Sequence, residues 1–293
     1  MLTRLVEAAE DLELASAVMT FEPHPREFFA PASAPPRLST LRDKLEAFAG
    51  QGVARTYVAR FNAALAALSP QTFIDEVLVR RLGVRWLLVG HDFRFGKARA
   101  GDIATLRGSA RTFSVEGMHN VSVNNERISS SAVRAALAAG DLGRATALLG
   151  RPYRIGGRVA HGAKLGRSLG FPTANLILKR KPPLSGIFAV RVHGLGGTPR
   201  LGAASLGVRP TVEAARGVPL LEVFILDFDE PIYGRRIAVD FMHKLRDEAR
   251  FPDLDSLKHQ IGRDVEATRK WGQVYLSGGA PSPVSARSPN KYT

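Results

Sequence analysis

The segment Gly166–Leu176, GRSLGFPTANL, carries side chains suited to holding a metal ion beside phosphate groups. Glycines on both sides of this short polar cluster indicate that the backbone must approach another group closely. Thr173 adds a hydroxyl and Asn175 an amide oxygen, and hard oxygen ligands of this kind bind magnesium next to phosphates. The segment therefore predicts the phosphate and metal corner of an ATP site. A polar turn between two strands is the alternative interpretation.

A second candidate for chemistry is Glu222, which lies in the apolar run Leu221–Leu226. Alternation with a period of two places it on one strand face with Phe224 and Leu226, so its carboxylate is expected among apolar groups. A carboxylate in such surroundings must be paired, bind a metal ion or have a shifted pKa. A general base is one interpretation, and a salt bridge to a neighbouring arginine is the other. The charged segment Lys244–Glu248 either lines a site or forms a solvated turn.

A cluster of three serines precedes a helix that the sequence predicts up to Ala139. Ser130 and Ser131 offer hydroxyls and free backbone N–H groups at the helix start. Arg134 lies just inside the helix, where it can contact the same anion. Together these groups could hold a triphosphate. An ordinary serine cap with a surface arginine explains the pattern equally well.

Helices and strands alternate over residues 1–150, which is typical of a parallel sheet covered on both faces. The patterns predict helices near residues 2–9, 38–51, 69–82, 128–139 and 141–149, and strands at 15–21, 56–58 and 84–89. Ligands bind such sheets at the loops after the carboxyl ends of strands. His24 and Asp92 lie in two of these loops. We place the end of this domain at Gly150.

Short strand-like runs separated by glycine and proline turns replace the alternation after residue 151. They lie at residues 153–159, 186–192, 201–206, 221–226 and 236–241, and a helix follows at 251–270. The predicted fold is thus an α/β nucleotidyltransferase-like, Rossmann-like parallel-sheet domain over residues 1–150. A small antiparallel β-barrel domain with a C-terminal helix follows over 151–275. Residues 276–293 have the composition of a disordered tail.

Composition limits the classes of protein that this chain can belong to. The 293 residues are 45% hydrophobic, enough for two domains, and the net charge of +14 favours anionic partners. The charge is spread along the chain, so it does not by itself select nucleic acid. The absence of cysteine excludes disulfides, thiolate nucleophiles and cysteine metal sites. No signal peptide and no apolar run near the roughly 20 residues of a bilayer span are present, so we expect a cytoplasmic protein without a membrane partner.

The C-terminal half resembles bacterial riboflavin kinase over most of residues 151–272. The matching segments, in order, are HGAKLGRSLGFPTANL, GIFAVRV, GAASLGVRPT, LEVFILDFDEPIYGRRIAVDF and KLRDEARFPDLDSLKHQI. The N-terminal half resembles the adenylyltransferase domain of the same bifunctional enzyme, the bacterial riboflavin kinase/FAD synthetase. There the matching segments are TFEPHP, VGHDFRFGK and ISSSAVR.

The resemblance implies roles for the kinase half. It implies that Thr173 and Asn175 hold magnesium and the ATP phosphates, and that Glu222 orients and deprotonates the ribityl hydroxyl of riboflavin. It implies that a flap over ATP contains four further residues, which are Gly157, His161, Gly162 and Arg167. It places Arg246 and Glu248 at the border of the flavin. The implied reaction is ATP-dependent phosphorylation of riboflavin to FMN.

For the N-terminal half, the resemblance implies transfer of AMP from ATP to FMN, which yields FAD and pyrophosphate. Ser130, Ser131 and Arg134 match the motif that holds the ATP phosphates, and His24 and Asp92 fall in loops that line the active site. The family begins with a strand and a histidine-glycine-histidine loop, and this sequence starts after that point. We therefore expect weak or absent adenylyltransferase activity and low stability of the first domain for the chain as it stands.

Two alternative functions remain open at this point. In one, the chain is a riboflavin kinase only, with an inactive N-terminal domain. In the other, it is a basic nucleotide- or RNA-binding regulatory module, which would need exposed aromatic side chains among basic ones. The aromatic residues lie mostly within apolar strands, so nucleic acid is not the expected partner.

Overall fold

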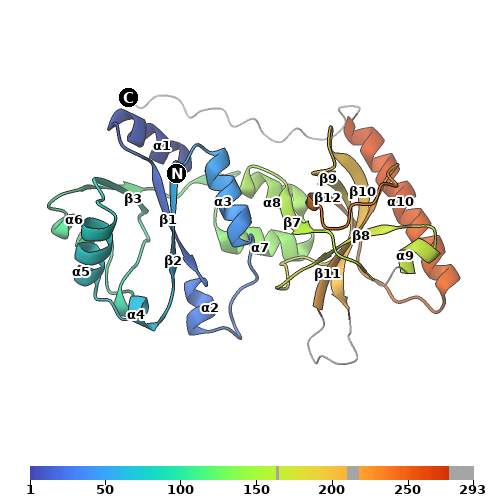
Figure 1. Ribbon diagram of the computed structural model, residues 1–293, viewed down its shortest axis with the longest axis horizontal. Helices are drawn as coiled ribbons and strands as arrows, with labels where there is room; N and C mark the ends of the chain where they lie inside the picture. Colours follow the sequence, from blue (N-terminus) through green and yellow to red (C-terminus); the bar gives the residue numbers. More distant parts are fainter. Residues whose placement is uncertain (163–164, 210–217, 277–293) are drawn as a thin grey trace. The chain divides into compact units, whose positions relative to one another are not determined.

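The computed structural model describes residues 1–162, 165–209 and 218–276, and the predicted tail at 276–293 lies almost wholly outside them. The described residues form two compact units (Figure 1). Unit 1 contains Met1–Pro35 and Thr40–Ser122, and unit 2 contains Pro36–Ser39 and the chain from Val123 onward. The predicted boundary at Gly150 stays a prediction.

Unit 1 alternates helices and strands, as the sequence predicts. In order, its elements are α1 (Leu2–Asp11), β1 (Ala17–Glu22), α2 (Pro25–Phe29), α3 (Leu41–Gly50), β2 (Arg55–Arg60), α4 (Ala63–Ala66), α5 (Pro70–Thr72), the π-helix η1 (Phe73–Arg81), β3 (Trp86–Gly90), the 3-10 helix η2 (Lys97–Arg99), α6 (Ile103–Ser109) and β4 (Ser114–Met118). Side-chain caps fix several helix starts. Thr40 caps α3 in a reciprocal pair with Asp43, and Ser69 caps α5.

The strands of unit 1 form two parallel pairs, β1 with β2 and β3 with β4. Parallel pairing is what the alternating pattern predicts. In the described residues the two pairs share no hydrogen-bonded ladder. A cavity of about 670 Å³ is lined by residues of α1, β1 and β3, among them Leu5, Ala17 and Trp86. The apolar core of the unit surrounds η1, with Ile74 and Leu106 completely buried.

Unit 2 begins with a short strand pair and a helical hairpin, and its remaining strands form one sheet. The elements are β5 (Ser122–Val123), β6 (Glu126–Arg127), α7 (Ser130–Ala139), α8 (Leu142–Leu149), β7 (Tyr153–Arg158), α9 (Leu165–Ser168), β8 (Thr173–Ile177), β9 (Gly186–His193), β10 (Arg200–Arg209), β11 (Val218–Ile225), β12 (Arg236–Arg246) and α10 (Leu254–Leu276). Gly140 and Gly150 end the two hairpin helices in the left-handed conformation.

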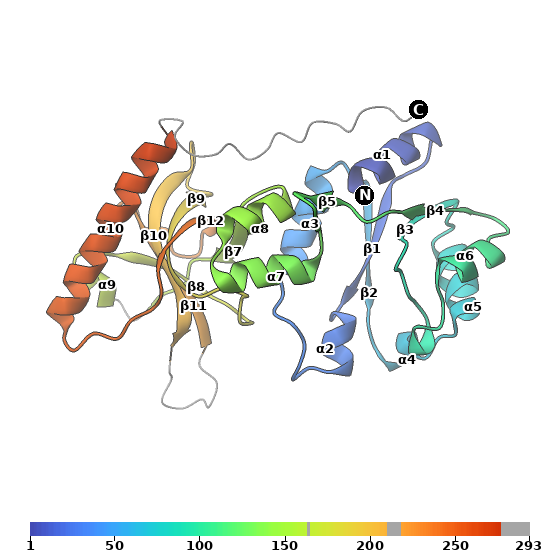
Figure 2. The ribbon, with the colours of Figure 1, turned by 180° about the vertical axis from the view of Figure 1, so that it is seen from behind.

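The six long strands form an antiparallel sheet in the order β7-β12-β9-β10-β11-β8. A bridge between Ala160 and Asn175 brings the two ends of the sheet toward each other. The side chains on the concave face, including Phe188, Leu221 and Phe241, form a core that α7 and α8 share. Helix α10 lies along the opposite face, against β9, β10 and β12 (Figures 1 and 2). We call this opposite face the outer face. The curled antiparallel sheet and its terminal helix confirm the predicted fold class.

The structure corrects two of the alternative interpretations. The polar turn considered for Gly166–Leu176 does not hold at Thr173–Ile177, which is the strand β8, with Ala174 and Leu176 buried in the core. The solvated turn considered for Lys244–Glu248 does not hold for its first three residues, because β12 continues to Arg246 and pairs there with Ile187 of β9. Two β-bulges in β12 allow this extension by shifting the register with β9.

Candidate functional site

The predicted metal corner lies on β8. Ala174 and Leu176 point into the core, so strand alternation turns Thr173 and Asn175 to the outer face. Asn175 is only 5% exposed. Its Nδ2 donates to the carbonyl of Thr173 at 3.1 Å, while its Oδ1 is buried and has no hydrogen-bond partner in the described residues. A buried acceptor without a partner is costly, so this oxygen is suited to a bound group.

Glu222 lies directly opposite Asn175 on the neighbouring strand β11. Leu221 and Val223 are completely buried in the core, so Glu222 points to the outer face with Phe224. The sequence thus correctly grouped Glu222 with Phe224, and the aromatic ring of Phe171 packs edge-to-face on Phe224 at 5.4 Å. The amide and the carboxylate are brought together by strand pairing.

A cavity of about 380 Å³ opens beside these residues. Its walls include Gly162, Thr173, Asn175, Phe228 and Tyr233. Any side chain at Gly162 would collide with the Asn175 amide, since an added Cβ would lie 2.5 Å from Nδ2. The ring of His161 stacks on Tyr233 with a centroid distance of 4.0 Å, beside the cavity. The predicted phosphate residues Gly162, Thr173 and Asn175 therefore line one cavity.

One row of directly opposed residues crosses the sheet from this cavity. Asn175 pairs with Glu222, Glu222 with Ser205 on β10, Ser205 with Ile187 on β9, and Ile187 with Arg246 on β12. The core cluster contains none of these five residues, although it contains both neighbours of Asn175, Glu222 and Ser205, and Phe188 beside Ile187. Arg246 lies on the outer face because it pairs with Asp264 of α10. The row therefore joins the predicted metal corner, the predicted base and a predicted flavin-binding arginine on one face.

Arg246 is fixed by helix α10. Its Nε and Nη2 donate to the two carboxylate oxygens of Asp264 at 2.9 and 2.6 Å, and its Nη1 donates to the carbonyl of Asp247. Gln260 donates to the same carboxylate at 2.9 Å. Two-point pairing of this kind sets the plane of a guanidinium as well as its position.

The carboxylate of Glu248 packs against Gly207 of β10, where any Cβ would collide with it. Gly207 lies two residues from Ser205 on the same strand face. Burial raises the pKa of Glu248, although the nearby charge of Arg246 opposes this shift. The two predicted flavin-binding residues thus lie near the row that begins at Asn175.

Two predicted flap residues have a different placement. Gly157 lies on β7 opposite Ile237, and a side chain there would meet Leu176 of the core at 2.7 Å. Close packing therefore explains this glycine, which does not line the cavity. Arg167 belongs to α9, and its side chain lies outside the described residues.

The adenylyltransferase candidates are divided between the two units. In unit 1, His24 caps α2 by accepting the N–H of Arg26 at 3.2 Å, and Asp92 follows the carboxyl end of β3. In unit 2, Ser130 and Ser131 form the first turn of α7, which Ser129 caps. Their assignment to one nucleotide site stays a prediction.

Arg134, the fifth adenylyltransferase candidate, contacts two backbone carbonyls. Its Nε donates to the carbonyl of Pro36 at 2.6 Å and its Nη1 to that of Ser130 at 3.1 Å. These contacts hold the side chain along the first turn of α7. The prediction that it contacts phosphate rests on the motif alone.

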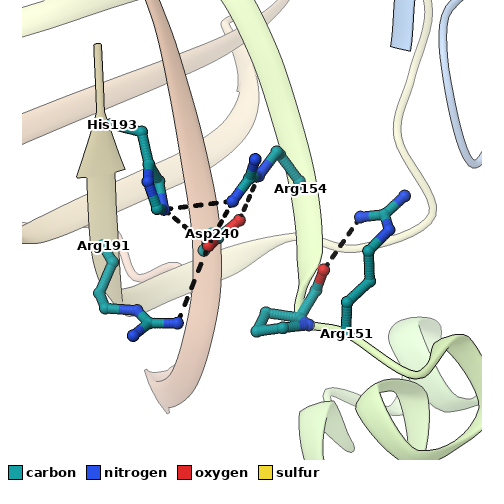
Figure 3. A network of polar contacts seen from close by, with 6 residues as sticks. Arg151, Arg154, Arg191, His193 and Asp240 are labelled. Carbon is teal, nitrogen blue, oxygen red and sulfur yellow. Dashed lines mark hydrogen bonds and ion pairs between the residues drawn. The ribbon is translucent and has the colours of Figure 1, made fainter. Parts of the chain in front are cut away.

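A separate polar cluster lies on the outer face at β7, β12 and β9 (Figure 3). Asp240, 2% exposed, accepts from Arg154 at 2.6 and 2.9 Å and contacts Nε2 of His193 at 2.8 Å. Arg191 lies 4.0 Å away on the other side. Burial opposes the charge on Asp240, but Arg154 and then His193 hold its pKa below the ordinary value. The cluster ties three strands together outside the candidate site.

Sequence reasoning missed three residues near the site. They are Ser205, Tyr233 and Asp264. Ser205 and Tyr233 lie within the matching segments GAASLGVRPT and LEVFILDFDEPIYGRRIAVDF, which was an available signal. Only the strand register and the position of α10 reveal what these side chains face.

The comparisons with known proteins cover both units. A family model described as riboflavin kinase matches residues 149–272, and one described as FAD synthetase matches residues 1–132. Three bifunctional riboflavin kinase/FMN adenylyltransferases are similar over 92% of this chain. The one from Pseudomonas fluorescens is 48% identical with 86% of its length covered, that from Haemophilus influenzae 44% with 87%, and that from Escherichia coli K12 45% with 87%.

A solved structure described as a macrolide-efflux protein from Streptococcus pneumoniae superposes with a TM-score of 0.76 at 28% identity. The match covers 92% of this chain and 88% of that one. Among the helices of the described residues, none combines the length and hydrophobicity that a membrane crossing requires. Sequence relatives and both family models agree with the resemblance drawn from the motifs, and the chain belongs to the family of bifunctional riboflavin kinase/FMN adenylyltransferases.

Proposed function

We propose that this chain phosphorylates the terminal ribityl hydroxyl of riboflavin with ATP and then transfers AMP from a second ATP to FMN. The observation that carries the kinase half is the direct opposition of Asn175 and Glu222 on the outer face, beside a cavity. Phosphoryl transfer depends mainly on positioning and on neutralising charge. An oxygen donor set and a carboxylate held by adjacent strands provide both.

The nucleotide is proposed to occupy the cavity beside β8. Gly162 leaves room at the Asn175 amide, and Phe228 and Ile232 add apolar surface to the lining. The stacked rings of His161 and Tyr233 lie at its border. A pocket with apolar walls and a few convergent polar groups is typical of a small-molecule site.

Magnesium fits the donor set at this corner. Asn175 presents a buried Oδ1 without a partner in the described residues, and Thr173 carries a hydroxyl on the same strand face. Oxygen atoms from an amide and a hydroxyl, completed by phosphate oxygens, are ligands that Mg²⁺ prefers. When bound, the ion would neutralise phosphate charge. No cluster of three or more histidine or carboxylate side chains competes for this role in the part of the chain that is described.

Glu222 is proposed to orient the terminal ribityl hydroxyl and to accept its proton. The hydroxyl oxygen attacks the γ-phosphorus of ATP, the bond from that phosphorus to the bridging oxygen breaks, and ADP leaves. Arg246 and Glu248, at the other end of the row, are proposed to border the flavin ring. Asp264 keeps the guanidinium of Arg246 in one plane.

The roles proposed for the adenylyltransferase half follow the motifs of the resemblance. Ser130, Ser131 and Arg134 would hold the ATP phosphates, while His24 and Asp92 would line the site. A phosphate oxygen of FMN attacks the α-phosphorus of ATP, and pyrophosphate leaves. The match of a FAD synthetase family model to residues 1–132 supports this half.

The test is to incubate the purified chain with riboflavin, ATP and magnesium and to separate the flavins by chromatography. We expect FMN to form first and FAD to follow from it, and FAD at a normal rate would contradict the weak or absent adenylyltransferase activity expected from the sequence. FMN without FAD would support the kinase and contradict the second activity. Neither product from a chain that circular dichroism shows to be folded would overturn the proposal.

A further inference from the structure

Ser205 occupies the middle of the row between the predicted base and the predicted flavin end. It lies directly opposite Glu222 on one side and opposite Ile187 on the other. Its neighbours Ala204 and Leu206 are buried in the core, so its side chain points to the outer face. Among the described residues, its hydroxyl has no hydrogen-bond partner. A hydroxyl can both donate and accept, so it is suited to a polar ligand.

The residues that flank Ser205 on its own strand face are small. The next outer-face positions on β10 are Ala203 and Gly207, which have small side chains or none. Glu248 reaches over the strand at Gly207. On this stretch of β10, Ser205 therefore carries the one hydroxyl that faces the strip leading from Glu222 toward Arg246.

The spacing of the residues along the row matches the length of the ribityl chain of riboflavin and the position of the ring beyond it. Neighbouring strands lie about 4.8 Å apart, so Ser205 is about one spacing from Glu222 and Arg246 about three spacings, or roughly 14 Å. An extended chain of four carbon–carbon bonds covers about 5 Å, since each bond is about 1.5 Å long. A ribityl chain whose terminal hydroxyl lies at Glu222 therefore passes over Ser205, with the ring beyond it.

We propose that Ser205 positions riboflavin by hydrogen-bonding an inner hydroxyl of its ribityl chain. This inference rests on the proposed kinase function and extends it to a residue that sets substrate specificity. The bond forms when riboflavin binds and persists in the transition state. Removing it weakens binding of riboflavin and leaves binding of ATP unchanged.

The experiment compares Ser205→Ala with the unaltered full-length chain. One neutral hydrogen bond corresponds to about a five- to tenfold change in kcat/KM. We expect kcat/KM for riboflavin to fall by this factor because KM for riboflavin rises. The KM for ATP should stay unchanged. Ser205→Thr, which keeps the hydroxyl, should retain most of the activity. Ser185→Ala, at an exposed serine directly before β9, is the matched control and should behave like the unaltered chain.

A flavin with an ω-hydroxypentyl chain in place of ribityl separates positioning from a structural role. This probe keeps the terminal hydroxyl and lacks the inner ones. The unaltered chain and Ser205→Ala should phosphorylate it with equal kcat/KM. Circular dichroism and thermal unfolding confirm that the variant is folded.

Three outcomes would overturn the inference. One is a kcat/KM of Ser205→Ala for riboflavin within twofold of the unaltered chain. Another is an equal loss with riboflavin and with the ω-hydroxypentyl probe, because the serine would then act through the protein structure. The third outcome is that the unaltered chain forms no FMN, which would overturn the proposed function itself. The first two outcomes overturn only the role of Ser205.

Discussion

Asn175 on β8 lies directly opposite Glu222 on β11, so a buried amide oxygen and a carboxylate share one face of two neighbouring strands. The two residues are far apart in sequence and belong to different matching segments. Their pairing gives each proposed role a geometric basis, because a metal-binding oxygen and a general base must act on the two partners of one phosphoryl transfer.

Replacing Glu222 by Gln should remove the proposed base and keep the shape of the side chain. We expect kcat for FMN formation to fall about 100-fold or more, with little change in the dissociation constant of riboflavin. Steady-state kinetics and quenching of riboflavin fluorescence measure the two quantities. Glu266→Gln, on the exposed side of α10, serves as control. Unchanged turnover in Glu222→Gln would show that the base assignment is wrong.

Gly162→Ala should displace the Asn175 amide, because the added Cβ would lie 2.5 Å from its Nδ2. Misplacing a group that orients phosphate is costly, and we expect kcat/KM for ATP to fall about tenfold or more. Gly143→Ala on α8 is the control, since its new methyl group has only Asp141 nearby, at 3.7 Å. Equal kinetics for the two variants would contradict the proposed position of the phosphates.

Asp240→Asn should destabilise unit 2 at neutral pH by about 2 to 3 kcal/mol, because Arg154, Arg191 and His193 would lose their buried counter-charge. The folded-state pKa of Asp240 is lowered, so its stabilisation is present above the ordinary pKa, near 4, and is lost as the pH falls through the folded value. The difference in melting temperature should therefore shrink below about pH 4.

A control for Asp240→Asn is Asp227→Asn, which breaks a two-point pair with Arg269 at an exposed position. Exposed pairs contribute little to stability, so its melting temperature should stay close to that of the unaltered chain. Thermal unfolding followed across pH distinguishes the two variants. A similar pH-dependent loss in both would show that burial of Asp240 is not the cause.

Glu248→Gln should stabilise the folded chain at neutral and alkaline pH. Burial raises the folded-state pKa of Glu248, so its favourable contribution is present below the ordinary pKa and is lost as the pH rises through the folded value. Glutamine cannot ionise and avoids this loss. The melting temperature of the variant should exceed that of the unaltered chain at pH 8, and the difference should be smaller at pH 4. A constant difference would argue against desolvation of this carboxylate as the cause of the raised pKa.

The sequence predicted the class of each half because local patterns suffice for that purpose. Alternating helices and strands indicated parallel pairs, and glycine-separated strands indicated an antiparallel sheet, as the structure confirms. Helix caps are equally local, since a pair such as Thr40 and Asp43 joins residues three apart. The strand β8 was not predicted, because glycine and proline precede its five residues and favoured the interpretation as a polar turn.

The motifs by themselves named Thr173, Asn175 and Glu222, and a period of two placed Glu222 with Phe224. Which face is buried, and which residues lie opposite one another, depended on pairing between distant strands. A shift of one residue would turn every side chain to the other face, so the register had to be set by the whole core. For that reason only the tertiary structure revealed the position of Ser205 opposite Glu222 and the two hydrogen bonds from Arg246 to Asp264.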